Sequence, residues 1–298
     1  MITARIWGGL GNQFFQYAYA FSVAQRTGSD LQLDLSFYDY EKVHKPILLE
    51  FSLDSRKICM MTDLPCRIGD LQGKWKNRLL WIPENSQTKL SNGQIYVKES
   101  RLHYMEHLAQ LNENNVYLDG YWQCPVYFKH IRQDLVRQYR LISNNYLKVN
   151  SRLIEAITNT ESVAVHIRRG DYLNKWNQIV YGLRPLPDAY YQATINQAKL
   201  RIQNPLFVFF TNDPVYVKDK YGSLPNVLIV SDIIQATDAE ELMIMSMCKN
   251  HIIANSTFSW WAAWLSENTS QSVWAPKAGW GNRDILPATW NSVDVKWR

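Results

Sequence analysis

The second half of the chain alternates short apolar runs with segments patterned as helices. The apolar runs occupy residues 162–167, 206–211, 227–230, 251–254 and 272–274. The helix-like segments lie between them, at residues 188–202, 214–221, 238–248 and 257–267, and Asp238 is expected to cap the third. Short strands separated by helices indicate βαβ units and a parallel sheet. This half therefore predicts a Rossmann-like domain with about five parallel strands.

The first half carries a less regular α/β pattern. Strands are predicted at residues 2–7, 31–35 and 116–122, and helices at residues 12–26 and 127–139. Gly28 is placed to end the first helix. Residues 62–100 hold scattered Pro and Gly with little periodicity, which favours loop and short helix. Because polar residues interrupt the pattern over 144–151, we expect two domains, at 1–150 and 151–298.

The composition is that of an ordinary globular protein. Of 298 residues, 46% are apolar, and the net charge of +5 comes without a basic tract. Nucleic-acid binding is therefore not expected, whereas a small anionic ligand or loose contact with an acidic membrane surface fits. The N-terminus lacks the pattern of an export signal, and no apolar run reaches the ~18 residues of a membrane span. The 12 Trp and 17 Tyr favour stacking surfaces for sugars or bases, or simply a large core.

Residues 163–172 hold the most informative pattern of the chain. They read VAVHIRRGDY, so a strand of buried character runs directly into His166, Arg168, Arg169 and Asp171. A charge at such a place is costly unless an anion or hydrogen bonds offset it. The planar fork of arginine grips phosphate, and ligands of open α/β sheets bind at the C-terminal ends of strands. The segment predicts a diphosphate site; the alternative is a structural network that pairs both arginines with Asp171 and another carboxylate.

The turn at residues 7–13 lies between a predicted strand and a helix. It contains Gly8, Gly9 and Gly11 followed by Asn12, but it lacks the last glycine of a dinucleotide fingerprint. Backbone N–H groups can approach an anion in such a turn, and the helix N-terminus adds partial positive charge. Tight turning alone is the alternative role of these glycines.

Two further strand ends carry candidate ligand-binding groups. After the strand at 251–254, Ser256 and Thr257 offer hydroxyls beside free N–H groups at a helix start, with Phe258 next to them. After the strand at 206–211, the carboxylate of Asp213 can accept from a purine N–H or a ribose hydroxyl. Capping of the helix that begins at Pro214 is an equally good role for Asp213.

Metal-binding patterns are not found in the sequence. No two of the 16 aspartates are separated by a single residue, so there is no D-x-D pair to hold Mg²⁺ against a nucleotide diphosphate. The four cysteines match no zinc spacing. We therefore expect no metal, and arginines and helix ends must then balance the charge of a bound diphosphate.

Three motifs give the chain a resemblance to a known family. They are, in order, residues 9–18 (GLGNQFFQYA), 166–171 (HIRRGD) and 255–261 (NSTFSWW). Together they resemble the bacterial α-1,2-fucosyltransferases, within the inverting glycosyltransferase family that includes the blood-group H enzymes. The resemblance implies a GT-B architecture, with two Rossmann-like domains facing a cleft and the acceptor on the N-terminal side. It also implies GDP-fucose as donor, no cofactor and no required metal.

The resemblance also implies roles for individual residues. Arg168 would hold the β-phosphate, His166 would lie against the guanine, and Asp213 would read the guanine. The other donor-binding residues expected from the motifs are Gly9, Gly11, Asn12, Arg169, Ser256, Thr257 and Phe258. Protein O-fucosyltransferases resemble this chain in the glycine turn but carry Arg where Gly9 stands, so no role for an arginine carries over there.

The implied reaction is attack by the 2-hydroxyl of a terminal β-galactose on the anomeric carbon of fucose, with inversion and loss of GDP. Arg168 is expected to stabilise the charge that grows on the diphosphate. Asp171 is expected to orient the arginines rather than to act as general base, and His44, Asp34 and Asp119 are open alternatives for the base. Competing hypotheses are another GDP-sugar, another acceptor position, or a non-catalytic GDP- or glycan-binding protein.

The partners and the location follow from the same resemblance. We expect GDP-fucose and a galactoside acceptor as ligands, and no nucleic acid. The lack of an export signal predicts a cytoplasmic protein that builds surface polysaccharide and touches the inner membrane only peripherally.

Overall fold

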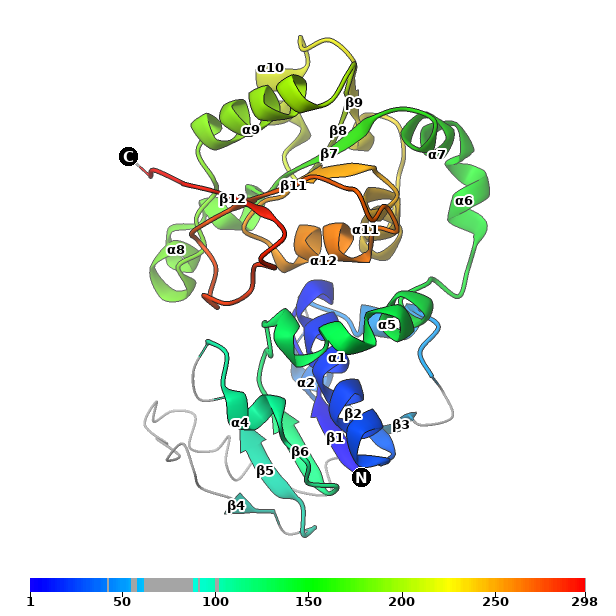
Figure 1. Cartoon of the computed structure of the whole chain (residues 1–298), viewed down its shortest axis with the longest axis vertical. Coiled ribbons are helices and arrows are strands. Elements are labelled where there is room, and N and C mark those ends of the chain that lie inside the picture. Colours follow the sequence, from blue (N-terminus) through cyan, green and yellow to red (C-terminus); the bar gives the residue numbers. More distant parts are fainter. Residues whose placement is uncertain (42, 55–57, 62–87, 91, 100–101, 298) are drawn as a thin grey trace. The chain divides into compact units, whose positions relative to one another are not determined.

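A computed structural model of the chain describes residues 1–41, 43–54, 58–61, 88–90, 92–99 and 102–297. The chain divides into two compact units, Met1–Arg140 (unit 1) and Leu141–Arg298 (unit 2). Each unit contains a six-stranded, mainly parallel sheet with helices, so the expected α/β fold with two Rossmann-like parts is confirmed (Figure 1). The acceptor and donor roles expected for the two halves stay predictions.

The sheet of unit 1 has the strand order β3-β2-β1-β6-β5-β4. All neighbouring strands are parallel except β4, which is antiparallel to β5. The strands are β1 (Ile2–Arg5), β2 (Leu31–Asp34), β3 (Ile58–Met61), β4 (Thr88–Lys89), β5 (Ile95–Lys98) and β6 (Val116–Asp119). The helices are α1 (Leu10–Thr27), α2 (Phe37–Tyr40), α4 (Glu106–Ala109) and α5 (Arg132–Gln138), with 3₁₀ helices η1 (Ile47–Glu50), η2 (Pro125–Tyr127) and η3 (Lys129–Ile131).

Helix α1 forms the centre of the core of unit 1. It is buried on nearly every side from Leu10 to Ala24, because aromatic and small residues alternate around it. Phe14 of α1 stacks on Tyr139 with ring centroids 3.9 Å apart. Gly28 ends the helix in the left-handed region at φ 62°, as its place in the sequence predicts.

Three expectations for unit 1 were wrong. The described residues between 88 and 99 include strands β4 and β5, where loop and short helix were expected; residues 62–87 lie outside the described part. Strand β5 is only four residues long, which is too short for its alternating pattern to stand out in the sequence, and the nearby Gly93 favoured the assignment to loop. Helix α1 begins at Leu10, two residues early, and the helix expected at 127–139 is η3 followed by the shorter α5.

The sheet of unit 2 is parallel throughout, with the order β12-β11-β10-β7-β8-β9. The strands are β7 (Ser162–Ile167), β8 (Leu206–Thr211), β9 (Val227–Ile229), β10 (Asn250–Ile252), β11 (Val273–Pro276) and β12 (Asn291–Val293). The helices are α6 (Asn145–Val149), α7 (Ser151–Thr158), α8 (Lys175–Tyr181), α9 (Asp188–Arg201), α10 (Pro214–Tyr221), α11 (Asp238–Ser246) and α12 (Thr257–Leu265), with η4 (Gly170–Leu173) and η5 (Val230–Asp232).

The prediction for unit 2 needs two corrections. The sheet has a sixth strand, β12, whose Asn-Ser-Val sequence has no apolar run to mark it. Helix α11 is capped by Thr237 rather than by Asp238: the Thr237 hydroxyl accepts from Glu240 N–H, and the Glu240 carboxylate accepts from Thr237 N–H. Asp238 is therefore the first residue of the helix, where its negative charge interacts favourably with the helix dipole.

Helices cover both faces of the unit 2 sheet. Figure 1 shows α9 and α10 on one face and α11 and α12 on the other. Val163, Val165 and Ile167 of β7 pack in a core with Tyr190 and Tyr191 of α9. Because side chains alternate along a strand, His166 points to the opposite face, where its ring centroid lies 5.7 Å from that of Phe258 in α12. Strand β7 is a central strand of this sheet, with β8 and β10 on its two sides.

Candidate active site

The C-terminal edge of the unit 2 sheet gathers most of the predicted donor-binding residues. Strand β7 is paired with both β8 and β10, and all three run in the same direction. Their ends lead into Arg168, Asn212 and Ser256 respectively, within four residues of each strand. Ligands of open parallel sheets bind at this edge, so the structure brings the three sequence segments together where a ligand is expected.

Arg168 is held by one contact and leaves most of its guanidinium open. Its Nε lies 2.9 Å from Oδ1 of Asp171, and the two side chains are 36% and 43% exposed. Its guanidinium carbon lies 5.8 Å from the ring of Tyr172. Within the described residues neither Nη group contacts an acceptor. Both Nη groups of the guanidinium are therefore available to donate to a phosphate. The prediction that Asp171 orients an arginine is thus met in the geometry of Arg168.

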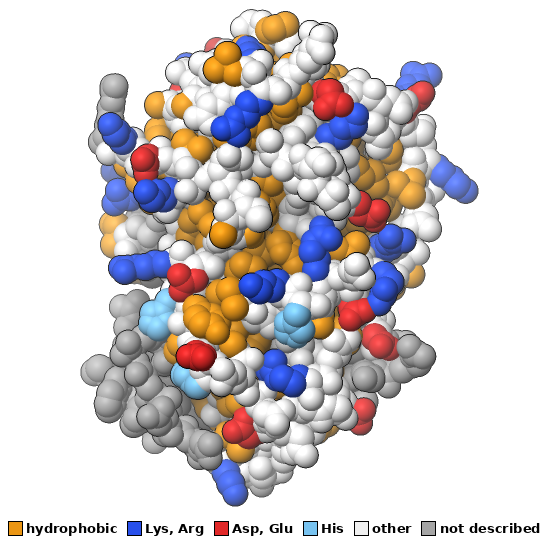
Figure 2. Space-filling model, viewed as in Figure 1, with side chains coloured by type: hydrophobic (Ala, Val, Ile, Leu, Met, Phe, Trp, Pro, Cys, Tyr) orange, Lys and Arg blue, Asp and Glu red, His pale blue; other side chains and the backbone are white. Residues whose placement is uncertain are grey.

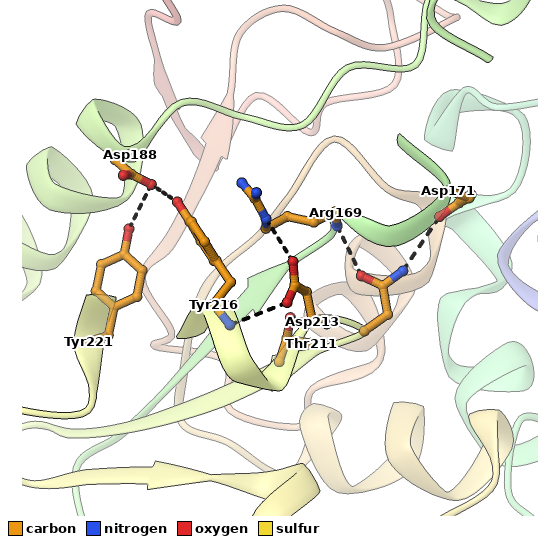
Figure 3. Close-up of polar contacts among 8 residues, drawn as sticks. Arg169, Asp171, Asp188, Thr211, Asp213, Tyr216 and Tyr221 are labelled. Atoms are coloured by element: carbon orange, nitrogen blue, oxygen red, sulfur yellow. Dashed lines mark hydrogen bonds and ion pairs between the residues drawn. The ribbon is translucent and has the colours of Figure 1, made fainter. Parts of the chain in front are cut away.

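Arg169 has the structural contacts that were the alternative for this motif. Its Nε donates to Oδ2 of Asp213 at 3.0 Å, and its guanidinium carbon lies 3.6 Å from the ring centroid of Tyr216 (Figure 3). The other oxygen of Asp213 accepts from Tyr216 N–H at 3.2 Å and caps α10. The capping role of Asp213 is therefore confirmed, while its reading of guanine stays a prediction. Each arginine is thus paired with a carboxylate, as the alternative for the motif predicted, and phosphate binding by Arg168 stays a prediction.

Hydrogen bonds join the loop after β7 to the end of β8. Asn212 accepts from Arg169 N–H through Oδ1 at 2.9 Å, and its Nδ2 lies 3.5 Å from Oδ1 of Asp171. Gly170 makes this approach feasible, because a Cβ at that position would lie 2.4 Å from Nδ2 of Asn212. Farther along, Tyr216 and Tyr221 both donate to Asp188, which ties α10 to α9 (Figure 3). The polar network fixes the loop that presents Arg168.

His166 is a buried, neutral base beneath the site. Burial, with the nearby charge of Arg168, lowers its pKa from 6.5 to about 3. Its Nδ1 is buried and has no hydrogen-bond partner within the described residues. A buried polar atom without a partner is costly, so an N–H or hydroxyl of a ligand would be bound favourably there.

Replacement of His166 by Phe is expected to make the stability of the protein less sensitive to acid. Below pH 6.5 the unfolded chain takes up a proton at His166 that the folded protein does not, so folding loses about 1.4 kcal/mol per pH unit until about pH 3. His166→Phe removes this loss. Urea unfolding between about pH 7 and 4 should give a less positive slope of the free energy of unfolding against pH for the variant than for wild type. His251, whose pKa is lowered to about 4, acts in the same direction as His166, and Glu99 and Glu241, whose pKa values are raised to about 7, act in the opposite direction, but all three are common to both proteins. Equal slopes would contradict the buried neutral state of His166.

The N-terminus of α12 meets the same edge. Ser256 is the residue before the helix, its backbone is extended at φ −131°, and its side chain makes no capping bond. The hydroxyl of Tyr172 donates to the preceding residue, at Asn255 O, over 3.1 Å. Phe258 is half-buried against His166. Helix N-terminal N–H groups are suited to phosphate, so this end is a fitting second contact for a diphosphate. The tryptophans of α12 are buried in the core, as expected.

The sequence pattern missed Glu241 as a candidate. This residue lies in the first turn of α11 and is half-buried, and its side chain has no hydrogen-bond partner within the described residues. Burial, with Asp238, raises the pKa of its carboxyl to about 7, and Arg168 acts in the opposite direction. Helix-start acids are common, so nothing in the sequence separated Glu241 from its neighbour Glu240. The fold reveals it as a titratable group close to Arg168.

The glycine turn lies in unit 1. Gly8 has φ 76°, and Gly9 precedes α1 in an extended conformation without any side-chain cap. Gln13 holds the turn by donating to Gly8 O at 2.8 Å and to Lys45 O at 2.7 Å, and Asn12 accepts from Gln123 at 2.9 Å. Gly11 is buried inside α1. The turn has a structural role, and its contact with a diphosphate stays a prediction.

The charged side chains on the face shown in Figure 2 are mixed in sign. On the face in Figure 2, lysines and arginines are scattered among acidic and uncharged side chains. Within the described ranges, no three His, Cys, Asp or Glu side chains are grouped as a metal site requires. The thiols of Cys124 and Cys248 are buried. None of the helices described is long and apolar enough to cross a membrane.

Residues 1–281 match the sequence model of glycosyl transferase family 11. The chain belongs to this family. It is 29% identical to an α-1,2-colitosyltransferase of Escherichia coli, over 99% of this chain and 96% of the relative. It is 27% identical to the O-antigen biosynthesis glycosyltransferase WbnK of Escherichia coli, over 96% and 97% of the two chains. Galactoside 2-α-L-fucosyltransferase Sec1 of mouse is 22% identical over 89% of this chain and 64% of its own length.

A solved structure shares the fold of this family 11 protein. The α-1,6-fucosyltransferase NodZ, soaked with GDP-fucose, aligns over 89% of this chain and 91% of NodZ with a TM-score of 0.51. The sequence identity is 17%, so the likeness concerns the fold alone. The expected GT-B type of α/β architecture is therefore confirmed. The chain is a glycosyltransferase of family 11, and its relatives include an α-1,2-colitosyltransferase and a galactoside 2-α-L-fucosyltransferase.

Proposed function

We propose that this chain transfers L-fucose from GDP-fucose to the 2-hydroxyl of a terminal β-galactose, with inversion at the anomeric carbon. The observation that carries the proposal is the presentation of Arg168. Its guanidinium stands at the C-terminal end of β7, oriented by Asp171, with both Nη groups available. Named family relatives that form α-1,2 linkages support the linkage.

Charge at the departing diphosphate is the main chemical problem of this reaction. Arg168 would bind the β-phosphate and stabilise the negative charge as the bond to fucose breaks. The N-terminus of α12, with Ser256 and Thr257, would contribute N–H groups and hydroxyls from a neighbouring strand end. We propose that these contacts replace a metal ion, so the enzyme needs neither a metal nor another cofactor.

Recognition of the nucleotide would use the two groups that lack partners. His166 stays neutral, and its Nδ1 can bind a polar group of the base. Glu241 can accept from an N–H of the base or from a ribose hydroxyl. Asp213 already bonds Arg169 and α10, so any contact with guanine would be an additional bond.

A second candidate donor is GDP-colitose, because the α-1,2-colitosyltransferase matches the chain over nearly its full length. Colitose lacks the 3-hydroxyl of fucose. A site that hydrogen-bonds this hydroxyl discriminates strongly against the analogue without it, whereas an apolar site discriminates weakly. The ratio of kcat/KM for the two donors therefore distinguishes the two functions.

The test is incubation of the purified protein with lactose and each donor in the presence of EDTA, followed by mass spectrometry and linkage analysis. A deoxyhexose on O2 of galactose, with GDP released, is the expected result. Product only from GDP-colitose would replace fucose as the sugar. Activity that disappears with EDTA and returns with Mg²⁺ would overturn the metal-independent mechanism. GDP binding without any product would favour a non-catalytic role.

A further inference from the structure

The C-terminal edge of the unit 1 sheet carries polar groups that no donor role explains. Strands β1, β5 and β6 are neighbours, and Trp7, Glu99 and Tyr121 follow within two residues of their ends. The rings of Trp7 and Tyr121 lie 4.1 Å apart between centroids at an interplanar angle of 36°. All three residues are half-buried. Aromatic rings with a few placed polar groups are typical of small-molecule sites.

The carboxylate of Glu99 is oriented by the backbone of the next strand's end. Its Oε2 accepts from Tyr121 N–H at 2.7 Å and from Trp122 N–H at 3.0 Å. Its Oε1 is buried and has no hydrogen-bond partner among the residues that the structure describes. One oxygen therefore anchors the side chain, and the other is left over for a ligand.

The turn around this carboxylate is specially built. Trp122 is buried and has φ 57°, a conformation that is unfavourable for a non-glycine residue. A Cβ at Gly120 would lie 2.4 Å from Cβ of Glu99, so only glycine admits the side chain there. Successive N–H groups in such a turn form an anion-binding concavity, and Glu99 occupies it. Strained backbone of this kind is concentrated at functional sites.

A hydrogen-bond donor without a partner accompanies the carboxylate. Nε1 of Trp7 is buried and has no hydrogen-bond partner within the described ranges. A buried donor or acceptor without a partner is unfavourable, because it has lost its hydrogen bonds to water. Sugar hydroxyls both donate and accept, so a saccharide against Tyr121 would satisfy Trp7 and Glu99 together. Burial, against the effect of the two N–H bonds, raises the pKa of Glu99 to about 7.

We propose that Trp7, Tyr121 and Glu99 bind the galactoside acceptor, and that Oε1 of Glu99 takes the proton of its attacking hydroxyl. The inference rests on the proposed transfer reaction. The O–H bond breaks as the proton passes to Oε1, and the hydroxyl oxygen bonds to the anomeric carbon of fucose. The bond from that carbon to the diphosphate breaks, and its electron pair leaves with GDP. The proton then passes to solvent.

The carboxylates that the sequence raised as candidates for the base already have partners. Asp34 accepts from the hydroxyl of Tyr117 and from Ser36 N–H at 2.9 Å. Asp119 accepts from Arg5 at 3.1 Å and from the Tyr96 hydroxyl at 2.6 Å. Glu99 differs from both because one of its oxygens has none among the described residues.

The decisive variant is Glu99→Gln. The amide oxygen of Gln can still accept from both backbone N–H groups, so the turn is retained while the base is lost. We expect kcat with lactose to fall about 10²- to 10³-fold, with the affinity for GDP unchanged. The wild-type rate should rise with pH through about 7, as the carboxyl deprotonates, and the variant should lack this rise. Glu106→Gln, on an exposed side chain of α4, is the matched control and should keep the wild-type rate.

The acceptor contact is tested separately with Trp7→Phe, which keeps an aromatic ring and removes the N–H. Its KM for lactose should rise while its KM for GDP-fucose does not. If wild type transfers fucose and Glu99→Gln keeps both its kcat and its pH profile, the inference is overturned and the proposed function stands. A wild type that makes no product overturns both. Should Glu99→Gln fail to fold, an unchanged lactose KM in Trp7→Phe overturns the acceptor site.

Discussion

Replacement of Arg168 by Ala is expected to lower kcat/KM for fucose transfer about 10²- to 10³-fold, equivalent to ~3–4 kcal/mol of transition-state stabilisation. The reason is the loss of a preorganised cation where the diphosphate gains charge. The side chain is 36% exposed and forms an exposed ion pair with Asp171, so the fold should survive. Steady-state kinetics with GDP-fucose and lactose, together with thermal melting, measure both effects.

Two further variants serve as controls for the Arg168 experiment. Arg168→Lys keeps the charge but loses the planar fork, so it should recover only part of the rate. Arg152→Ala, at an exposed position of α7, removes an arginine of no expected importance and should act as wild type. Near-full activity of Arg168→Ala would remove Arg168 from the site and leave the arginine motif with a structural role only.

Replacement of Asp119 by Ala is expected to destabilise the protein by about 3–5 kcal/mol, because it leaves a buried cation without its carboxylate. Asp119 and Arg5 form an ion pair at 3.1 Å with both side chains only 9% exposed. The Tyr96 hydroxyl loses its acceptor as well. Urea unfolding monitored by tryptophan fluorescence gives the free energy of unfolding for wild type and variant.

The size of this effect is checked by two comparisons. Joint replacement of Arg5 by Met and Asp119 by Leu removes both charges and should restore much of the lost stability. Asp232→Ala breaks an exposed pair with Lys218, at 3.4 Å, and should change stability by less than about 1 kcal/mol. A loss below about 1 kcal/mol for Asp119→Ala would show that the Arg5 charge reaches solvent once its partner is gone.

Regular βαβ segments could be predicted from sequence to within a residue or two. The expected bounds of β7, β8 and α10 agree with the structure because each is marked locally: an apolar run followed by charged residues, or an Asp-Pro helix start. That Arg168, Asp213 and Ser256 lie at one edge of the sheet follows from the rule that parallel strands end at one edge. Such inferences need only the local pattern and the direction of the strands.

Features that depend on distant partners could not be predicted. Arg169 finds Asp213 and Tyr216 across more than 40 residues, so the division of roles between two adjacent arginines is visible only in the fold. Glu99 falls in the stretch that the sequence assigned to loop and short helix, and its interest comes from the N–H groups of Tyr121 and Trp122. Glu241 likewise acquires its raised pKa from burial, which no sequence position reveals.

The central position of α1 has a consequence during synthesis of the chain. Tyr19 donates to Leu108 O at 2.9 Å, Ser22 to Tyr127 O at 2.9 Å, and Tyr139 to Phe14 O at 2.7 Å. These three partners of the helix therefore leave the ribosome more than 80 residues after it. Such distant closures make folding slow and leave apolar surface exposed meanwhile. We expect that a nascent chain stalled before residue 139 emerges keeps α1 accessible to proteases and chaperones, and that protection appears only afterwards.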